Sequence, residues 1–537
     1  MNCLKLFSLL KKSKGFKFSA NLENSIKYDV CIVGGGIAGL SAAIKLRQLR
    51  DDLTVCVLEK GSTIGSHVLS GNVFQPTYLK ELFNNWESMP NPPPLNTNVK
   101  SEKFKILFKN SSFDIPNFLF PSTMHNSNNY IISLGELCNW LSLRAEELGV
   151  DIFTGFAVDS MITNDKQENI GVRTKDFGID SKGGKKENYQ EGMSILAPIT
   201  ILAEGARGSN SEEIINKYKL RDDNVDPQSY GLGIKEIWET NDPNLLPGMV
   251  LHTVGYPFND KGYGGGFLYT LKGDNGLTIV HLGYIVGLDY KNPYINPYEE
   301  FQLWKTHKDI KSILEKCKII KYGARTLNEG GYFAIPKLVF PGGILIGCSA
   351  GFLNVAKIKG SHNAMKSGIV AAEAIASMSN IHEGIRLEQY EEKMKKSEVY
   401  KELYESRNVK GAFKKGNVFG MIHGFISGIT KGKEFWNFRN KKNDSELIET
   451  SEQFKKIEYP KHDNKITFDI LESVSRSGTH HDHDQISHLQ IKSDKEESPL
   501  ASFKKYAGFE ERYCPAKVYE FIEENNKPKL VINAQNC

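Results

Sequence analysis

Three glycines near the start of the chain, Gly34, Gly36 and Gly39, have the spacing GxGxxG. They follow a short apolar run at 28–33 and precede a run of small and aliphatic residues at 40–49 that is typical of a helix. In such a unit the first glycine allows a tight turn, the second lets the backbone approach a pyrophosphate, and the third lets helix and strand pack closely. The helix N-terminus offers free N–H groups and a positive dipole to the phosphates. The segment therefore predicts a dinucleotide site, and a coincidental glycine-rich turn is the alternative.

An acidic residue follows where a ribose would need it. Glu59 ends a second apolar run, 53–58, and lies twenty residues after Gly39. Its carboxylate can accept hydrogen bonds from the ribose diol of an adenosine. The next residue, Lys60, is also predicted to contact the cofactor.

Two later segments indicate FAD rather than NAD, because the longer cofactor needs support for its flavin end. The run 195–203, with Pro198 inside it, reads as a strand that leads into Glu204 and Gly205. The run 340–347 reads as another strand that ends at Gly347, shortly before Gly351, and 360–374 reads as a helix. A helix N-terminus there would stabilise the negative charge that develops on a reduced flavin. Three unrelated strand–turn–helix units are the alternative.

Two cysteines near the end of the chain indicate iron–sulfur chemistry. Cys514 is followed by Pro515, and Cys537 is the last residue given. A 4Fe–4S cluster is normally held by four cysteine thiolates. The six other cysteines lie far away in sequence, so both residues could instead be free thiols. The His-Asp run 480–484 has no metal-ligand spacing and is predicted to be a hydrogen-bonded loop.

The elements that position these residues belong to a large globular protein. A chain of 537 residues with 40% hydrophobic and 25% charged residues is long enough for several domains and is not disordered. Its net charge of +4 comes from the first 22 residues, which hold five lysines and no acid. That segment predicts a mitochondrial presequence, although it lacks arginine. The remaining charge is balanced, so a nucleic-acid partner is not expected.

One segment is predicted to lie on a membrane surface. Between Gly416 and Thr430 there is no charged residue, and six apolar residues share one helical face. A 15-residue helix is about 22 Å long, too short to cross a bilayer core of about 30 Å. Flanking lysines and Trp436 favour the lipid interface over an ordinary core-facing helix. A weaker apolar pattern at 78–86 is either a second such segment or core packing.

From about residue 27 onward the chain closely resembles the electron-transfer flavoprotein–ubiquinone oxidoreductases. The stretches that carry the resemblance are LEKGSTIGSHVLSGNVF, YGGGFLY, VGLDYKNPY, YGARTLNEGG, PGGILIGCSAGFLNVAKIKGSHNAMKSG, SVSRSGTHHDHDQ, RYCPAKVYE and INAQNC. The resemblance implies electron transfer from reduced electron-transfer flavoprotein, through a 4Fe–4S cluster and FAD, to ubiquinone. It also implies a monotopic protein on the matrix side of the mitochondrial inner membrane. Gly264 and Gly265 match the glycines that contact the quinone in that family.

The implied fold class is α/β in several domains. It comprises a Rossmann-like FAD domain of the glutathione-reductase/hydroxylase type, an inserted ubiquinone-binding α+β domain and an incomplete ferredoxin-like cluster domain. The predicted limits are 1–26 for the presequence, 27–90, 125–225 and 320–410 for FAD, 91–124 and 226–319 for ubiquinone, 411–440 for the membrane segment, and 455–537 for the cluster.

The cluster motif departs from the family pattern. Cys514 matches one ligand and Cys537 matches the first of a C-x-x-C-x-x-C run, so only two of four ligands are present. The sequence therefore predicts a chain truncated within the motif. Ala350 and Ala356 stand where the family would have proline, which loosens that loop slightly. Two alternatives stay open: an NAD(P)H-dependent FAD monooxygenase or reductase of the same fold, and a cluster-less, non-catalytic FAD-binding membrane protein.

Overall fold

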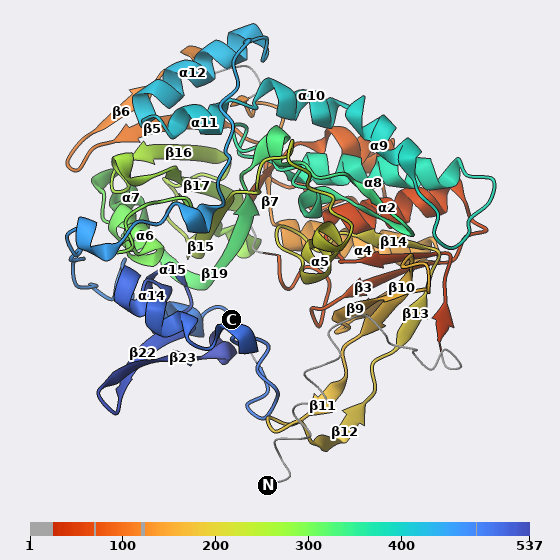
Figure 1. The fold of residues 1–537 in the computed structure, drawn as a ribbon. Helices are drawn as coiled ribbons and strands as arrows, with labels where there is room; N and C mark the ends of the chain where they lie inside the picture. The colour runs from red at the N-terminus through yellow and green to blue at the C-terminus, as the bar shows by residue number, and fades with distance from the viewer. Residues whose placement is uncertain (1–24, 69–70, 120–123, 480) are drawn as a thin grey trace.

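A computed structural model describes residues 25–68, 71–119, 124–479 and 481–537 (Figure 1). Most of the predicted presequence lies outside the described residues. Two large sheets organise the chain, one parallel and one antiparallel. Within the described part of the chain, no helix combines the length and the apolar composition that crossing a membrane requires.

The first sheet is a six-stranded, mostly parallel Rossmann-like layer. Its order is β20-β21-β14-β2-β3-β8, and the predicted strands at 28–33 and 53–58 form its centre. The strands are β2 (Val30–Val33), β3 (Val55–Glu59), β8 (Asp151–Thr154), β14 (Ile199–Leu202), β20 (Val339–Phe340) and β21 (Gly343–Leu345). Every residue of β2 and β14 is buried, as expected for parallel strands covered on both faces.

Two predicted strands are each divided in the structure. The run 195–203 forms β13 (Ser194–Leu196) and β14, which belong to different sheets. The division falls at Pro198, which has no N–H to donate to a continuing ladder. The run 340–347 is a tight antiparallel turn between β20 and β21 around Pro341 and Gly342. The prediction of single strands was wrong at both places.

Helices α2 (Ile37–Leu49) and α8 (Ser361–Ala376) pack against each other beside this sheet (Figure 1). They confirm the helices predicted at 40–49 and 360–374. A Cβ atom on Gly368 would lie 2.3 Å from the carbonyl oxygen of Ala38, so the small residue allows this close contact. Helix α4 (Leu134–Glu147) also packs on α2, and α5 (Ser209–Lys217) follows β14.

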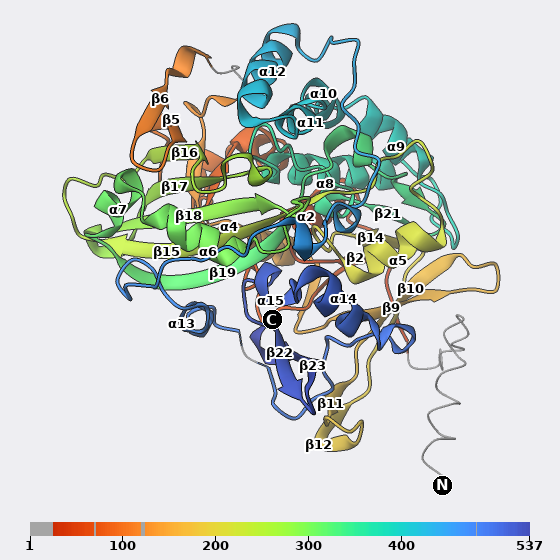
Figure 2. The same cartoon turned by 60° about the vertical axis from the view of Figure 1, so that its left-hand side comes forward.

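The second sheet has seven strands in the order β19-β15-β18-β17-β16-β5-β6. All neighbours are antiparallel except β16 and β5. The strands are β5 (Ser101–Leu107), β6 (Ser112–Ile115), β15 (Tyr230–Thr240), β16 (Met249–Gly255), β17 (Gly264–Lys272), β18 (Thr278–Gly287) and β19 (Lys318–Asn328). Helices α6 (Pro297–Lys305) and α7 (Lys308–Leu314) cover part of it, as Figure 2 shows.

Smaller sheets and short helices complete the described chain. The strands are β1 (Ile26–Lys27), β9 (Val158–Thr163) and β10 (Asn169–Thr174) beside β13, and the pairs β4 (Asn72–Phe74) with β7 (Tyr130–Ile132), β11 (Phe177–Ile179) with β12 (Lys185–Gln190), and β22 (Tyr519–Glu524) with β23 (Lys527–Ile532). The helices are α3 (Leu79–Leu82), α9 (Glu388–Lys395), α10 (Glu398–Glu405), α11 (Val409–Phe413), α12 (Asn417–Thr430), α13 (Ile470–Ser475), α14 (Ser498–Tyr506) and α15 (Glu510–Tyr513).

The two candidate membrane segments differ in how far their apolar residues are exposed. Helix α12 exposes its apolar face, whereas Gly420, His423 and Ser427 face the protein. The pattern at 78–86 instead packs into the core, because Leu79, Leu82 and Trp86 are buried there. Of the two predicted alternatives for 78–86, core packing is therefore the one found in the structure.

A buried ion pair joins the second sheet to the C-terminal region. The Lys305 ammonium lies 2.8 Å from Oε1 of Glu236, and both side chains are fully buried. The Trp238 indole donates to the same carboxylate over 2.8 Å, and the ammonium lies 5.1 Å from the ring centroid of Phe468. Phe468 in turn donates its backbone N–H to Gln302 over 3.0 Å. The pair therefore holds the segment after residue 463 against β15 and α6.

We predict that Lys305→Met destabilises the protein by about 3–5 kcal/mol, because it leaves the Glu236 carboxylate buried without its cation. The double variant Lys305→Met/Glu236→Gln should recover most of the loss, since the amide oxygen can still accept from Trp238. Urea unfolding followed by tryptophan fluorescence measures both changes. A single variant with a wild-type midpoint would contradict the importance of the pair.

Candidate functional site

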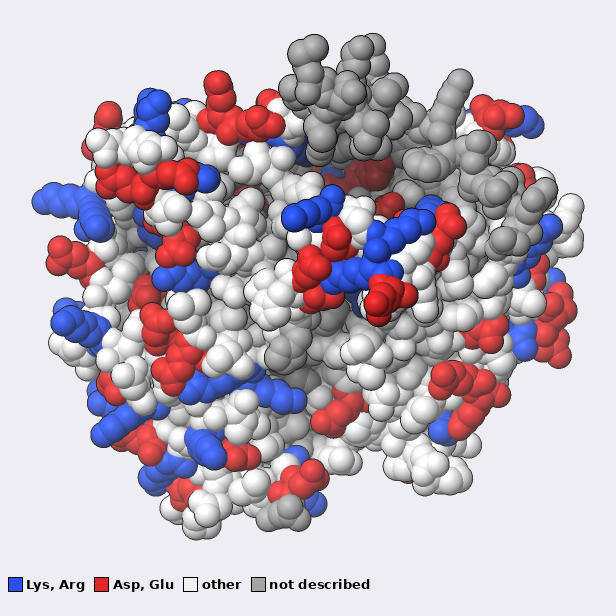
Figure 3. Space-filling model, turned by 90° about the horizontal axis from the view of Figure 1, so that it is seen from below, with Lys and Arg blue, Asp and Glu red and all other residues white. Residues whose placement is uncertain are grey.

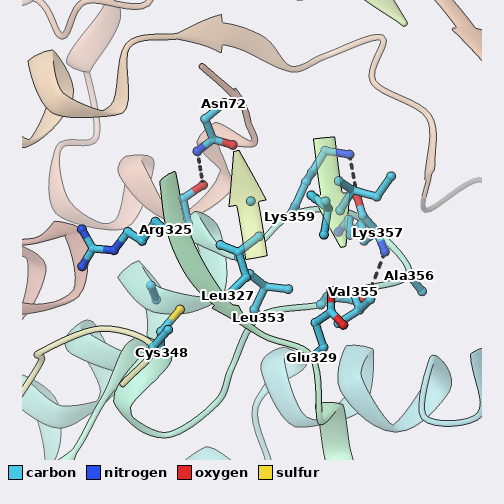
Figure 4. Close-up of a pocket in the computed structure, with 18 of the residues that line it drawn as sticks. Asn72, Arg325, Leu327, Glu329, Cys348, Leu353, Val355, Ala356, Lys357 and Lys359 are labelled. Carbon is cyan, nitrogen blue, oxygen red and sulfur yellow. Dashed lines mark hydrogen bonds between the residues drawn. The ribbon is translucent and has the colours of Figure 1, made fainter. Parts of the chain in front are cut away.

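One large cavity lies between the two sheets. Its volume is about 1390 Å³, above the ~300–1,000 Å³ of most small-molecule sites. Its walls come from the glycine-rich loop before α2, from strands β15–β19, from the loop before α8, and from α12. Figure 4 shows part of this wall, with Arg325 and Leu327 on β19 and Leu353 to Lys359 on the loop. The cavity therefore connects the glycine-rich loop, part of the predicted flavin segments and the predicted quinone segment.

The glycine-rich loop has the geometry that its spacing predicts. Gly34 has φ +115°, and a Cβ atom there would lie 2.4 Å from the carbonyl oxygen of Ala203, the residue after β14. A Cβ atom on Gly39 would lie 2.2 Å from the Gly34 carbonyl oxygen. Nothing lies within 4 Å of the corresponding position on Gly36, which lines the cavity at the N-terminus of α2. Two glycines are thus needed for packing, and the third leaves space for a phosphate.

Glu59 is held in place by backbone donors. Its Oε2 accepts from the N–H of Gly35 over 3.0 Å, and its Oε1 accepts from the N–H of Gly61 over 2.7 Å. Each oxygen keeps a second lone pair, so the carboxylate can still accept from a ribose. Both Glu59 and the exposed Lys60 line the cavity. These residues and the phosphate space fit the adenosine half of FAD.

The predicted flavin segments reach the cavity only in part. Glu204 and Gly205 line it, and the Glu204 carboxylate accepts from the Ser211 N–H over 2.6 Å at the start of α5. Gly347 and Gly351, both with positive φ, lie behind the wall rather than in it. Their role in the described structure is to shape the turn that leads to Cys348 and the loop before α8.

That loop brings a helix N-terminus to the cavity, as predicted. Gly360 and Ser361, at the start of α8, line the wall, and Asn72 donates to the Ser361 hydroxyl over 2.9 Å. Ala356 lies in the wall of the cavity, whereas Ala350 is fully buried behind it. The N-terminal end of α8, with its positive dipole, therefore lies at the cavity wall.

Gly264 and Gly265 lie at the start of β17 and line the same cavity. A Cβ atom on Gly264 would lie 2.5 Å from the Ile285 carbonyl oxygen, and one on Gly265 would lie 2.4 Å from that of Thr253. These glycines are therefore required by strand packing as well as by any close approach of a ligand. Beyond them the wall continues to apolar residues of α12 such as Phe425.

Sequence reasoning missed several buried titratable residues of this wall. Lys235 lies on β15, where burial lowers its pKa to about 8. His252 lies on β16 and pairs with the Tyr269 hydroxyl over 2.8 Å, and burial lowers its pKa to about 3. The loop residue Lys359 has a pKa near 8 for the same reason, burial. Alternation along a strand could have marked these side chains as inward-facing, but nothing in the sequence singles them out.

The cysteine pair lies at the other end of the molecule, next to the β22–β23 hairpin (Figure 1). Cys514 is buried, and burial raises its pKa although the N–H groups of Ala516, Lys517 and Val518 oppose this. Cys537 is exposed and lies close enough for its charge to affect Cys514. Among the described residues no group of three metal-ligating side chains exists. The two thiols alone do not complete a four-thiolate set.

The His-Asp run forms a hydrogen-bonded loop, as predicted, in the part that the structure describes; His480 lies outside it. Asp484 accepts from the Ser181 hydroxyl over 2.8 Å, and Asp482 pairs with Lys186 over 2.7 Å. The His481 ring contacts the Cys537 carbonyl oxygen over 2.5 Å. The loop thus connects the cysteine region to the β11–β12 hairpin.

Three family models match the chain. They are a ubiquinone-binding model of ETF-QO over residues 230–327, a 4Fe–4S model of electron transfer flavoprotein-ubiquinone oxidoreductase over 464–537, and an NAD(P)-binding Rossmann-like domain over 32–92. The first covers β15–β19, the second the cysteine region and the third the glycine-rich loop.

Curated relatives match nearly the whole chain. The mitochondrial electron transfer flavoprotein-ubiquinone oxidoreductase of Arabidopsis thaliana is 48% identical, over 97% of this chain and 81% of its own length. The probable enzyme of that name in Schizosaccharomyces pombe is 46% identical, over 95% and 81%. The human enzyme is 44% identical, over 95% and 84%.

We predict that Gly36→Val abolishes FAD binding without destabilising the protein, because a side chain there enters the open phosphate space. The matched variant Gly34→Val should destabilise the fold itself, because its Cβ atom would meet the Ala203 carbonyl. Flavin absorbance and thermal unfolding separate the two outcomes. Wild-type FAD affinity in Gly36→Val would refute the assignment of the phosphate loop.

Proposed function

Because the chain belongs to the electron transfer flavoprotein-ubiquinone oxidoreductase family, we propose that it takes electrons from reduced electron-transfer flavoprotein and transfers them to ubiquinone. It is an oxidoreductase and a mitochondrial protein, and its cofactors are FAD and a 4Fe–4S cluster. The observation that carries the proposal is the single cavity that joins the nucleotide loop to Gly264 and to α12. A polar cofactor entering at one end and an apolar substrate entering at the other would meet inside it.

We propose that the predicted site residues hold the two halves of FAD and the quinone head at different parts of this cavity. The adenosine half of FAD would lie against Gly34, Gly36, Gly39, Glu59 and Lys60. The flavin end would lie toward Gly205 and the first turn of α8, with Glu204, Gly347 and Gly351 shaping that wall. When bound, FAD supplies the ability to take up electrons singly and release them in pairs. The backbone at Gly264 and Gly265 would hold the quinone head.

We also propose attachment to the inner membrane, on its matrix side, and two surface elements support contact with a membrane. Six apolar residues of α12 are exposed, among them Phe425 at 41%. Phe108 and Phe113 of the β5–β6 hairpin are exposed as well, and Figures 1 and 2 both place this hairpin beside α12. Phe435 is 93% exposed, whereas Trp436 donates its indole N–H to His423. An apolar surface formed by two elements suits the lipid interface.

The partner flavoprotein is proposed to dock near the cluster region, residues 455–537. Figure 3 shows the molecule from below, where Lys and Arg side chains are interspersed with Asp and Glu side chains. Cys514 and Cys537 would be two ligands of the cluster, and the remaining ligands are not provided by described residues. We propose the domain limits that the sequence predicts, although β19 pairs with the ubiquinone-binding strands.

We expect the purified full chain to be yellow and to reduce a short-chain ubiquinone analogue when reduced electron-transfer flavoprotein is supplied. Absorbance of the quinone measures the reaction, and NADPH replaces the partner as the control donor. Rapid flavin bleaching by NADPH without quinone reduction would instead support a monooxygenase or reductase of the same fold.

We predict that the double variant Phe425→Glu/Ile426→Glu no longer sediments with vesicles of anionic phospholipid, because charges replace the apolar face. Phe177→Glu is the matched control, since Phe177 is 62% exposed on the β11–β12 hairpin at the opposite end of the molecule (Figure 1). It should sediment like the wild type. Undiminished sedimentation of the double variant would remove α12 from the membrane contact.

A further inference from the structure

Glu329 is a buried carboxylate in the wall of the cavity, immediately after β19. Its side chain is 3% exposed, and it is one of the lining residues drawn in Figure 4. A Cβ atom on Gly231 would lie 2.2 Å from its Oε1, and one on Gly287 would lie 3.3 Å from its Oε2. Gly287 donates its N–H to the carbonyl of Tyr263, the residue before Gly264. The carboxylate therefore lies beside the segment proposed to hold the quinone head.

A continuous series of polar groups connects Glu329 to the surface. Its Oε2 lies 2.8 Å from the ammonium of Lys410 on α11. That ammonium donates to the Ser229 hydroxyl over 2.6 Å, and the hydroxyl donates to Oδ1 of Asp444 over 2.8 Å. Asp444 is half-buried at the start of a short helix, Asp444–Glu446, directly after the proposed membrane segment. Every step in this series is within hydrogen-bond distance.

The charges around this series favour a carboxyl that can hold a proton. Burial raises the pKa of Glu329 although Lys410 opposes it, and burial raises the pKa of Asp444 in the same way. Burial lowers the pKa of Lys410, but Glu329 and Asp289 outweigh it and keep the ammonium charged. The other groups facing this site are Asp289, which also pairs with Lys414 over 2.8 Å, and the Tyr263 phenol.

We propose that Glu329 delivers protons to the cavity during ubiquinone reduction, and that Lys410, Ser229 and Asp444 return protons to it from solvent. The inference rests on the proposed function. Ubiquinone becomes ubiquinol by taking up two electrons, which reduced electron-transfer flavoprotein supplies, and two protons. For each proton the O–H bond of Glu329 breaks, and its carboxylate takes a replacement from Lys410. Once Lys410 is neutral, the Ser229 hydroxyl reorients and gives its proton to the amine while it takes the proton of the Asp444 carboxyl. Asp444 then regains a proton from hydronium in the solvent.

A purely structural role for the same groups makes a different prediction. A buried ion pair that only fixes the loop after β19 would affect stability when it is broken, but not the pH dependence of proton transfer. Glu329→Gln removes the transferable proton and keeps the size of the side chain. Glu300→Gln is the matched control, because Glu300 is equally buried, pairs with Lys261 over 2.7 Å and lies outside the series.

The test compares these variants as FAD-loaded full chains. In Glu329→Gln we expect reduction of a short-chain ubiquinone analogue to fall about 100-fold, within the range that a positioned proton donor contributes. Electron transfer to ferricenium, which takes up no proton, should stay within about twofold of wild type by the same reasoning. Formate should restore part of the quinone rate, and Glu300→Gln should behave like wild type in every assay.

The pH dependence of the quinone reduction rate tests the role of Glu329 independently. A donor must be protonated to act, so the wild-type quinone rate should fall as the pH rises through the pKa of Glu329. Glu329→Gln should lose that fall, and Asp444→Asn should slow proton return. Glu329→Asp, which keeps a carboxyl, should retain part of the rate.

Proton uptake when the bound FAD is photoreduced, followed with a pH indicator, needs neither quinone nor partner. It should be slower in Glu329→Gln than in wild type or Glu300→Gln. A wild type that fails to reduce quinone would refute the proposed function. The proton-uptake assay would still test whether Glu329 delivers protons to the cavity. Wild-type rates of uptake in Glu329→Gln would overturn the inference.

Discussion

The proposed function depends on one constraint: a charged dinucleotide and an apolar quinone would have to share a single cavity. At the nucleotide end, Gly34 and Gly39 allow close packing of the loop, and Gly36 leaves open space at the N-terminus of α2. At the proposed quinone end, β17 and apolar residues of α12 form the wall. The Rossmann-like sheet and the antiparallel sheet are the two bodies that make these opposite walls, and the loop before α8 closes the space between them.

Burial in this cavity changes the chemistry of its side chains. Lys235 and Lys359 have lowered pKa values, and Glu329 has a raised one, because each loses contact with water. The same wall also carries charged side chains such as Arg325, Lys357 and Glu402. A quinone bound there would need protons as well as electrons. The series that begins at Asp444 is the feature of the fold that meets this need.

Much of the glycine-rich loop could be predicted from the sequence, because each glycine there meets a local steric requirement of the backbone. The GxGxxG spacing implied a tight turn, a helix contact and an open space for a phosphate. The structure confirms the turn, the contact and the open space at Gly36, and its use by a phosphate stays a prediction. The exposed face of α12 followed equally from its period and its flanking lysines. Prediction was wrong where tertiary context decides: Pro198 divides a run between two sheets, and Pro341 turns another back on itself. Glu329, Lys410, Ser229 and Asp444 could not be recognised as a group, since only the fold brings their distant positions together.

The central claim is that FAD and a quinone head occupy this cavity within electron-transfer distance of each other. The most direct measurement is the reoxidation of photoreduced FAD in the purified chain, followed by stopped-flow absorbance without oxygen or partner protein. Our account predicts fast reoxidation on addition of a short-chain ubiquinone analogue, saturating with its concentration as expected for a bound substrate. Reoxidation that rises linearly with the analogue, at the rate of free reduced flavin, would contradict it.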